Sequence, residues 1–278
     1  MTKEGIIGVL LVAFFAVSVI VFPDYSFDTL AYHGPFVNEF AQFGQFRMPL
    51  NPLNWTDHVH YIFPKGVETL FGLAKQLNPF FPTILHILIL LGTVAGVNQI
   101  AVHLGVKDAW KASALFLSLN LMALIFKAFW VEFTITFLLT VLLNFFLREE
   151  KESMRTSMLF GLMGMAIAIS KINAIVYLVV IVGVLAYYSK KWMHGLATIA
   201  GGALGIFVSI LPALVRGIDL THEFRLVQAQ TNSIPVPLDT RIRVTFKGLI
   251  QGFQQPVLAL SLGACAVLAY WDKKSRPL

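Results

Sequence analysis

The sequence predicts an all-α membrane protein, a polytopic helical bundle of about eight transmembrane helices. The first observation is composition, since 57% of the 278 residues are hydrophobic and only 13% are charged, whereas a soluble domain carries about 25% charged residues. The second is the mean hydropathy of +0.74. The third is that most of the chain falls into apolar runs close to the roughly 20 residues that a spanning helix needs. These observations exclude an ordinary cytosolic enzyme and a disordered chain.

Eight apolar runs are long enough, or nearly long enough, to cross a bilayer. The first, 6–22, has no clear small-residue cleavage site after it, so we expect an uncleaved anchor rather than a signal peptide. Mostly short connections separate the other runs, which are 81–104, 109–126, 129–147, 157–171, 173–188, 193–215 and 253–271. We therefore expect one transmembrane domain over 1–278.

The distribution of basic residues orients the bundle. With the N-terminus in the cytoplasm, the short loops on that side carry 11 of the 21 Lys and Arg residues, and cytoplasmic loops are the ones enriched in them. Both termini are then cytoplasmic, and the two long loops, 23–80 and 216–252, lie on the outer side of the cytoplasmic membrane. The net charge of +6 fits this topology and contact with membrane lipids, and no nucleic acid partner is expected.

The first outer loop, 23–80, contains no run long enough to span the bilayer. Two of its segments, 36–43 and 67–77, are amphipathic. In the second segment one face is shared by Leu70, Phe71, Ala74 and Leu77. Because amphipathic helices lie in the membrane interface, we expect both segments to lie along the outer surface and to roof a cavity.

Acidic and aromatic residues follow the first predicted span directly, namely Asp24, Asp28, Tyr32 and His33. Asp28 and Tyr32 are four residues apart and would share one face of a helix. A carboxylate at the membrane edge suits a general base or a cation ligand. Aspartate is also a favoured helix N-cap, and the spacing alone leaves both roles open.

Three more charged residues lie near predicted outer ends of helices. Glu68 either supports the first turn of a helix that begins near Gly66 or belongs to a site. Glu132 snorkels to the interface, pairs with Lys127, or is an acid that faces the bundle. Lys171, between two short apolar runs, is either a loop lysine or a contact to a lipid phosphate.

The second outer loop contains Arg216 and Arg225 among its basic residues. Arginine suits bidentate binding of phosphate or carboxylate, and it binds lipid headgroups nonspecifically as well. His58 and His60 are expected to be solvated loop residues, since no third metal ligand lies nearby. The one cysteine, Cys265, offers neither a disulfide nor a cysteine metal site.

Several of these motifs, in their order along the chain, resemble the GT-C superfamily of integral-membrane glycosyltransferases. The similar branch includes bacterial protein mannosyltransferases and lipopolysaccharide sugar transferases. The motifs are Asp28-x-x-x-Tyr32-His33-x-Pro35, Phe63-Pro64-Lys65-Gly66-x-Glu68, Glu132 at the next outer turn, the helix that ends in Ala168-Ile169-Ser170-Lys171, and Asn232-Ser233-Ile234-Pro235.

The resemblance implies a transferase that moves a sugar from a polyprenyl-phosphate donor to an acceptor glycan, lipid or protein. It implies that Asp28, with Asp24 second, activates the acceptor hydroxyl or binds a divalent cation where one is used, and that Glu132 is a second acid. A divalent cation is the one cofactor left open. The substrate contacts implied are Tyr32, His33, Lys65, Glu68, Lys171, Arg216 and Arg225.

Two other functions stay open on the sequence. One is a noncatalytic membrane subunit of the same fold, which the short stretch after the last predicted span favours. The other is a transporter of a lipid-linked or anionic substrate, for which internal repeats and broken helices are typical. The sequence has no clear internal repeat, and the candidate residues gather at the outer face, which favours the transferase.

Overall fold

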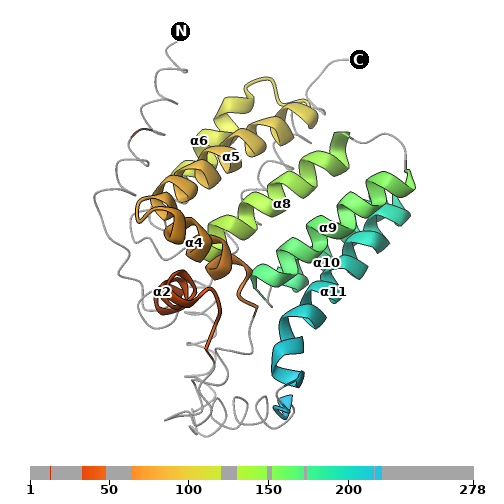
Figure 1. The fold of residues 1–278 in the computed structure, drawn as a ribbon. Helices are drawn as coiled ribbons and strands as arrows, with labels where there is room; N and C mark the ends of the chain where they lie inside the picture. The colour runs from red at the N-terminus through yellow and green to blue at the C-terminus, as the bar shows by residue number, and fades with distance from the viewer. Residues whose placement is uncertain are drawn as a thin grey trace, which may run out of the picture. The chain divides into compact units, whose positions relative to one another are not determined.

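The computed structural model describes residues 13, 33–47, 64–119, 130–148, 152–171, 174–215 and 217–220. Every regular element in this part of the chain is a helix (Figure 1), which confirms the all-α prediction. The helices are α2 (Gly34–Phe43), α4 (Gly66–Leu77), α5 (Phe81–His103), α6 (Ala109–Leu119), α8 (Trp130–Arg148), α9 (Met154–Ser170), α10 (Ala174–Ser189) and α11 (Trp192–Val215). They divide into two compact units, one with α5, α6 and α8 and one with α2, α4, α9, α10 and α11. A single transmembrane domain over 1–278 stays a prediction.

Two of the described helices, α5 and α11, are long and apolar enough to cross a membrane. Their bounds match the predicted spans 81–104 and 193–215 to within one residue. The helices α6, α8, α9 and α10 fall on four more predicted spans, with 11, 19, 17 and 16 residues. Apart from residue 13, the predicted spans 6–22 and 253–271 lie outside the described residues, so the number of eight spans stays a prediction.

The first unit is held together where α5 packs on α8. A Cβ atom on Gly92 would lie 2.5 Å from the ring of Phe137, so this close approach requires glycine. One turn further along α5, the side-chain amide of Asn144 donates to the carbonyl oxygen of Gly96 at 3.0 Å. Small residues and interhelical hydrogen bonds of this kind are typical of helix contacts in membranes.

The second unit is built on α9 and α11, which run side by side (Figure 1) and make the most extensive helix contact of the described chain. A Cβ atom on Gly201 would lie 2.6 Å from the carbonyl carbon of Gly161, and one on Gly205 would lie 2.8 Å from the carbonyl oxygen of Met165. The two backbones therefore touch. Near the start of both helices, Ser157 Oγ and His194 Nδ1 are joined by a buried hydrogen bond of 2.9 Å.

The helices α2 and α4 form a pair within the second unit. Gly72 lies against the ring of Phe40, where a Cβ atom would come within 2.9 Å. The ammonium group of Lys75 donates to the side-chain oxygen of Asn38. Gln76 Nε2 donates to the carbonyl oxygen of Phe40 at 3.1 Å. Both helices expected in the first outer loop are present, and their position on a membrane surface stays a prediction.

Part of the apolar face predicted for α4 is exposed. Leu70 and Leu77 are 42% and 77% exposed, whereas Phe71 is buried. The small Gly72 admits the ring of Phe40 on the neighbouring helix. The buried residues of α4 are Val67, Glu68, Phe71 and Gly72.

Candidate functional site

A cluster of buried and half-buried side chains lies where α2 meets the first turn of α4. His33 is the residue before α2, and Lys65 is the residue before α4. Glu68 lies in the first turn of α4, and Phe36 lies in the first turn of α2. Together His33, Phe36, Lys65 and Glu68 are called the α2–α4 cluster below.

The centre of the cluster is a hydrogen bond between His33 Nδ1 and Glu68 Oε1, 2.6 Å long. Both side chains are buried, at 11% and 3% exposure. Because an ionised carboxylate can only accept, the bond forms with the tautomer or charge state of His33 that carries a proton on Nδ1. The second oxygen, Glu68 Oε2, is buried and makes no hydrogen bond within the described part of the chain. A buried carboxylate oxygen in this state is an acceptor available to a ligand or an ordered water.

Lys65 brings a cation to the same place. Its Nζ atom lies 4.4 Å from the centroid of the Phe36 ring, a distance at which the ring face attracts a cation. Burial lowers the pKa of Lys65 from 10.5 to about 8, and the negative charge of Glu68 acts in the opposite direction. At neutral pH the amine is therefore mostly protonated, but it is less strongly basic than an ordinary lysine.

The first turn of α4 also touches the last turn of α9. A Cβ atom on Gly66 would lie 2.7 Å from the carbonyl oxygen of Ile169. Lys65 precedes this contact by one residue, and Lys171 follows Ile169 by two. Lys171 ends α9 in an extended conformation, with φ of −162° and ψ of 136°, and its side chain is half-buried. Two lysines that are 106 positions apart in the sequence thus flank one helix contact.

The other predicted site residues belong to the other unit or lie outside the described residues. Glu132 lies in the first turn of α8, in the other unit, and its side chain is outside what the structure describes. Its role as a second acid stays a prediction. The remaining candidates lie outside the described residues altogether: Asp24, Asp28, Tyr32, Arg216 and Arg225, with the loop histidines His58 and His60.

A divalent cation would need more ligands than the described side chains supply. His33 and Glu68 could provide two, but no group of three His, Cys, Asp or Glu residues within the described ranges could hold a metal ion. The arrangement that is present instead joins a cation, a carboxylate and an imidazole beside a helix N-terminus. These groups suit the binding of an anion and the transfer of a proton.

The sequence indicated His33, Lys65 and Glu68 separately, and it missed how they combine. Nothing in the spacing pairs His33 with Glu68, because 35 positions separate them. It also missed the cation–ring contact of Phe36 and the buried Ser157–His194 bond near the opposite end of α9. The one available signal for the latter was a histidine at the start of a long apolar run.

No family model, curated protein or solved structure matches this chain.

Proposed function

We propose that this chain is a membrane glycosyltransferase of the GT-C type. It moves a sugar from a polyprenyl-phosphate donor to an acceptor glycan, lipid or protein at the outer face of the cytoplasmic membrane. In this proposal the bundle has about eight spans and both termini are cytoplasmic. The observation that carries the proposal is the Lys65 ammonium group packed on Phe36, beside the His33–Glu68 pair, at the start of a short amphipathic helix.

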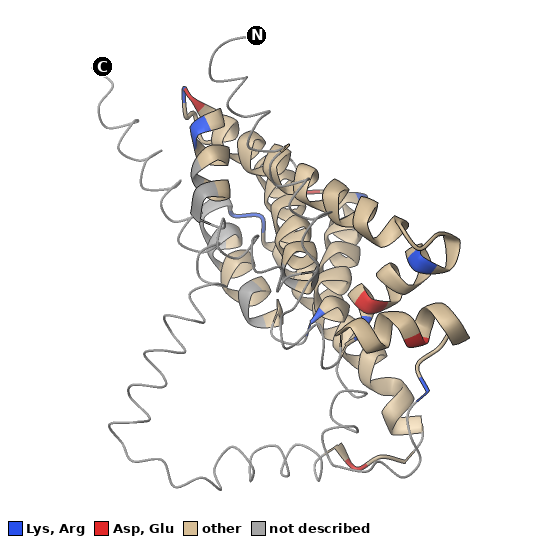
Figure 2. Ribbon diagram, turned by 90° about the vertical axis from the view of Figure 1, so that its left-hand side faces the viewer, with Lys and Arg blue, Asp and Glu red and all other residues tan. Residues whose placement is uncertain are grey.

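The apolar surfaces of the long helices support a membrane location. In the most apolar stretches of α5 and α11, 39% and 22% of the residues are buried, whereas the core helix of a soluble protein is mostly buried. Large side chains on their outer faces, such as Leu88 at 58% and Leu196 at 66%, are exposed. In the longer helices α5, α8, α9, α10 and α11, any charged residues lie near the ends, and long uncharged stretches remain between them (Figure 2). A bilayer provides the apolar surroundings that such surfaces need.

The start of α4 offers what a phosphate group requires. Its first-turn N–H groups receive no side-chain cap, and they form the positive end of the helix dipole. Lys65 adds a full positive charge at the same end, and Lys171 lies close along the chain to the contact of α4 with α9. The phosphate of a polyprenyl-phosphate sugar would be stabilised here both before and during transfer.

The reaction divides between two groups of residues. A carboxylate takes the proton of the acceptor hydroxyl while the hydroxyl oxygen bonds to C1 of the sugar. The bond from C1 to the phosphate oxygen breaks at the same time. Asp28 is our candidate for this base, with Asp24 second and Glu132 as a further acid. The released polyprenyl phosphate keeps its electron pair, and Lys65 stabilises the added negative charge.

Glu68 has a separate part in this proposal. Its Oε1 is bonded to His33, whereas its Oε2 is buried and makes no hydrogen bond in the described chain. The carboxylate lies one helical turn from Lys65, which brings the two side chains to the same side of α4. In this proposal, with Lys65 on the phosphate, Glu68 accepts a hydrogen bond from a hydroxyl of the attached sugar.

The test is a transfer assay with the full-length chain in nanodiscs and a panel of polyprenyl-phosphate sugars, which measures the release of free polyprenyl phosphate. Lys65→Met keeps the aliphatic stem and removes the charge. We expect the apparent KM for the donor to rise roughly tenfold to a hundredfold, because a charge-assisted contact contributes about 1.5–3 kcal/mol. Lys75→Met is the matched control on the same helix, where the ammonium group bonds Asn38, and it should leave the KM unchanged.

Two outcomes would contradict the transferase proposal, and each favours one alternative. Donor binding without turnover for every sugar in the panel would indicate a noncatalytic subunit. Movement of the intact donor across the bilayer without release of polyprenyl phosphate would indicate a transporter. An equal effect of Lys65→Met and Lys75→Met would remove Lys65 from the donor site.

A further inference from the structure

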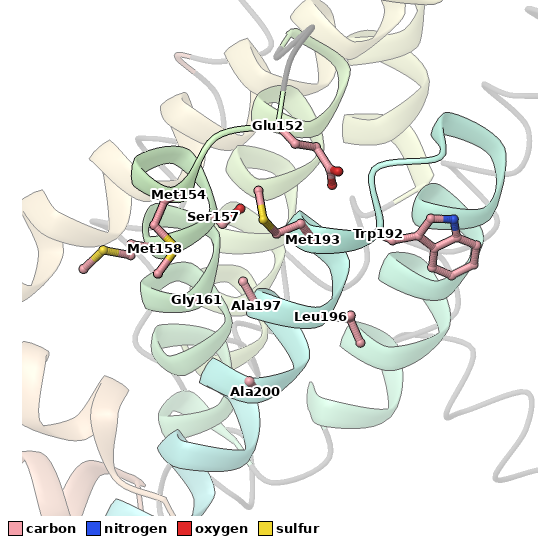
Figure 3. Close-up of a pocket in the computed structure, with 10 residues that line it drawn as sticks. All are labelled: Glu152, Met154, Ser157, Met158, Gly161, Trp192, Met193, Leu196, Ala197 and Ala200. Carbon is pink, nitrogen blue, oxygen red and sulfur yellow. The ribbon is translucent and has the colours of Figure 1, made fainter.

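A groove of about 620 Å³ runs between the N-terminal turns of α9 and α11 (Figure 3). Small residues form its floor, namely Gly161, Ala197 and Ala200. Its walls are formed by Met154, Met158 and Leu196, which are 73%, 62% and 66% exposed. Glu152 and Trp192 lie at the end where α9 and α11 begin, and Ala200 lies at the other end. Apart from Ser157 and Glu152, the lining of the groove is therefore apolar.

The packing of α9 on α11 explains why the groove is there. The backbones touch at Gly161 and Gly201, so the residues around this contact must be small. Longer side chains on either side, those of Met158 and Leu196, then stand above a shallow floor. The volume lies within the range of about 300–1,000 Å³ that is typical of ligand sites. An extended alkyl chain, which needs only apolar contact along a narrow path, fits this shape.

Basic residues and a tryptophan lie at the starts of the two helices that form the groove. Arg155 is exposed in the first turn of α9, and Lys190 and Lys191 immediately precede α11. Trp192, the first residue of α11, is 52% exposed. Tryptophan and basic residues at the end of a long apolar helix are typical of the level of lipid headgroups. The one described acid at the mouth, Glu152, accepts a hydrogen bond from the backbone N–H of His194 at 3.1 Å.

We propose that this groove binds one anionic phospholipid, with an acyl chain along the floor and the phosphate at Arg155 and Lys190. The apolar walls select an acyl chain, and the basic residues at the starts of the two helices select a negatively charged headgroup. The site is separate from the α2–α4 cluster, and it does not depend on the transferase proposal. Anionic lipid is concentrated in the leaflet that faces the basic ends of spanning helices, which is where the mouth is expected to lie.

The experiment is native mass spectrometry of the full-length chain in detergent, titrated separately with phosphatidylglycerol and with phosphatidylcholine of the same acyl chains. We expect one phosphatidylglycerol molecule to bind at least about fivefold more tightly than phosphatidylcholine, since each basic residue near the phosphate contributes about a fivefold factor. Ala200→Phe fills the floor and should weaken the binding of either lipid about tenfold. Ala203→Phe, the same change outside the groove on the same helix, should not.

Two more variants keep the proposal testable if Ala200→Phe folds poorly. Met158→Gln changes an exposed wall residue without filling the groove, and it should also weaken the binding of both lipids. Arg155→Gln combined with Lys190→Gln should remove the preference for phosphatidylglycerol and leave phosphatidylcholine binding unchanged. Equal affinity of the unmodified chain for the two lipids would overturn the headgroup assignment. Equal effects of Ala200→Phe and Ala203→Phe would overturn the site.

Discussion

The contact between α9 and α11 depends on Gly201, and the cost of adding one methyl group there follows from the structure. A Cβ atom at this position would lie 2.6 Å from the carbonyl carbon of Gly161 and 2.8 Å from its Cα atom. Carbon atoms pack best at about 3.5–4.0 Å, so Gly201→Ala would force the two helices apart by about 1 Å. Both sides of the contact are backbone, and no side-chain rotation relieves the clash.

This separation affects contacts along much of α9. The buried hydrogen bond between Ser157 and His194 would lengthen, and the close contact of Gly205 with the backbone of Met165 would open. Overpacking of a well-packed contact costs about 1–3 kcal/mol, and a rigid backbone contact belongs at the upper end of this range. We therefore expect Gly201→Ala to lower the free energy of unfolding by about 2–3 kcal/mol, measured as thermal unfolding of the purified chain in one detergent.

The control is Gly183→Ala on α10, where an added Cβ atom would meet no atom within 4 Å. This change removes the flexibility of glycine from a helix without a clash, and it should be neutral or stabilise the chain by up to about 1 kcal/mol. The two variants add the same methyl group to helices of the same unit. If Gly201→Ala unfolds at the same temperature as Gly183→Ala, the close packing of α9 on α11 is refuted.

Three further predictions concern the site and the other unit. Because burial lowers the pKa of Lys65 to about 8, the affinity for the donor should be full below pH 7 and fall as the pH rises through about 8. The Lys65→Arg variant stays charged and should retain its affinity at pH 9. Parallel pH profiles of donor affinity in the unmodified chain and in Lys65→Arg would contradict this role. Asp28→Asn keeps the shape of the side chain and should lower kcat by about 10²–10⁴; unchanged turnover in a folded variant would exclude Asp28 as the base. Asn144→Leu removes the hydrogen bond to the carbonyl oxygen of Gly96. It should lower the stability of the α5–α8 contact by about 1 kcal/mol, seen as a lower unfolding temperature. An unchanged unfolding temperature would show that the hydrogen bond contributes little.

The positions of the long helices could be predicted because a long apolar run has few alternatives. The predicted spans 81–104 and 193–215 correspond to α5 and α11. Helix starts in polar sequence are less visible. The helix α9 begins at Met154, three residues before the predicted 157, because Ser153 and Thr156 form a capping box that extends the helix into polar residues.

The candidate site could be predicted as a set of residues but not as an arrangement. Hydrophobic spacing in 67–77 indicated an amphipathic helix, which the structure confirms, but the inward face is set by the contact of Gly72 with Phe40. That contact decides which side of α4 is buried, and it carries Glu68 to His33. Contacts between distant segments of this kind depend on the shapes of both helices, and no local pattern in either one specifies them.

The most direct test of the central claim is photo-cross-linking of the full-length chain with a polyprenyl phosphate that carries a diazirine close to its phosphate. If the α2–α4 cluster binds the donor phosphate, the label should fall on the peptides that contain 33–47 and 64–77. Unlabelled polyprenyl phosphate should compete for it, and phosphatidylglycerol should not. The label should also be lost in Lys65→Met and kept in Lys75→Met. Labelling that avoids both peptides, or that phosphatidylglycerol removes equally well, would contradict the assignment of this cluster as the donor site.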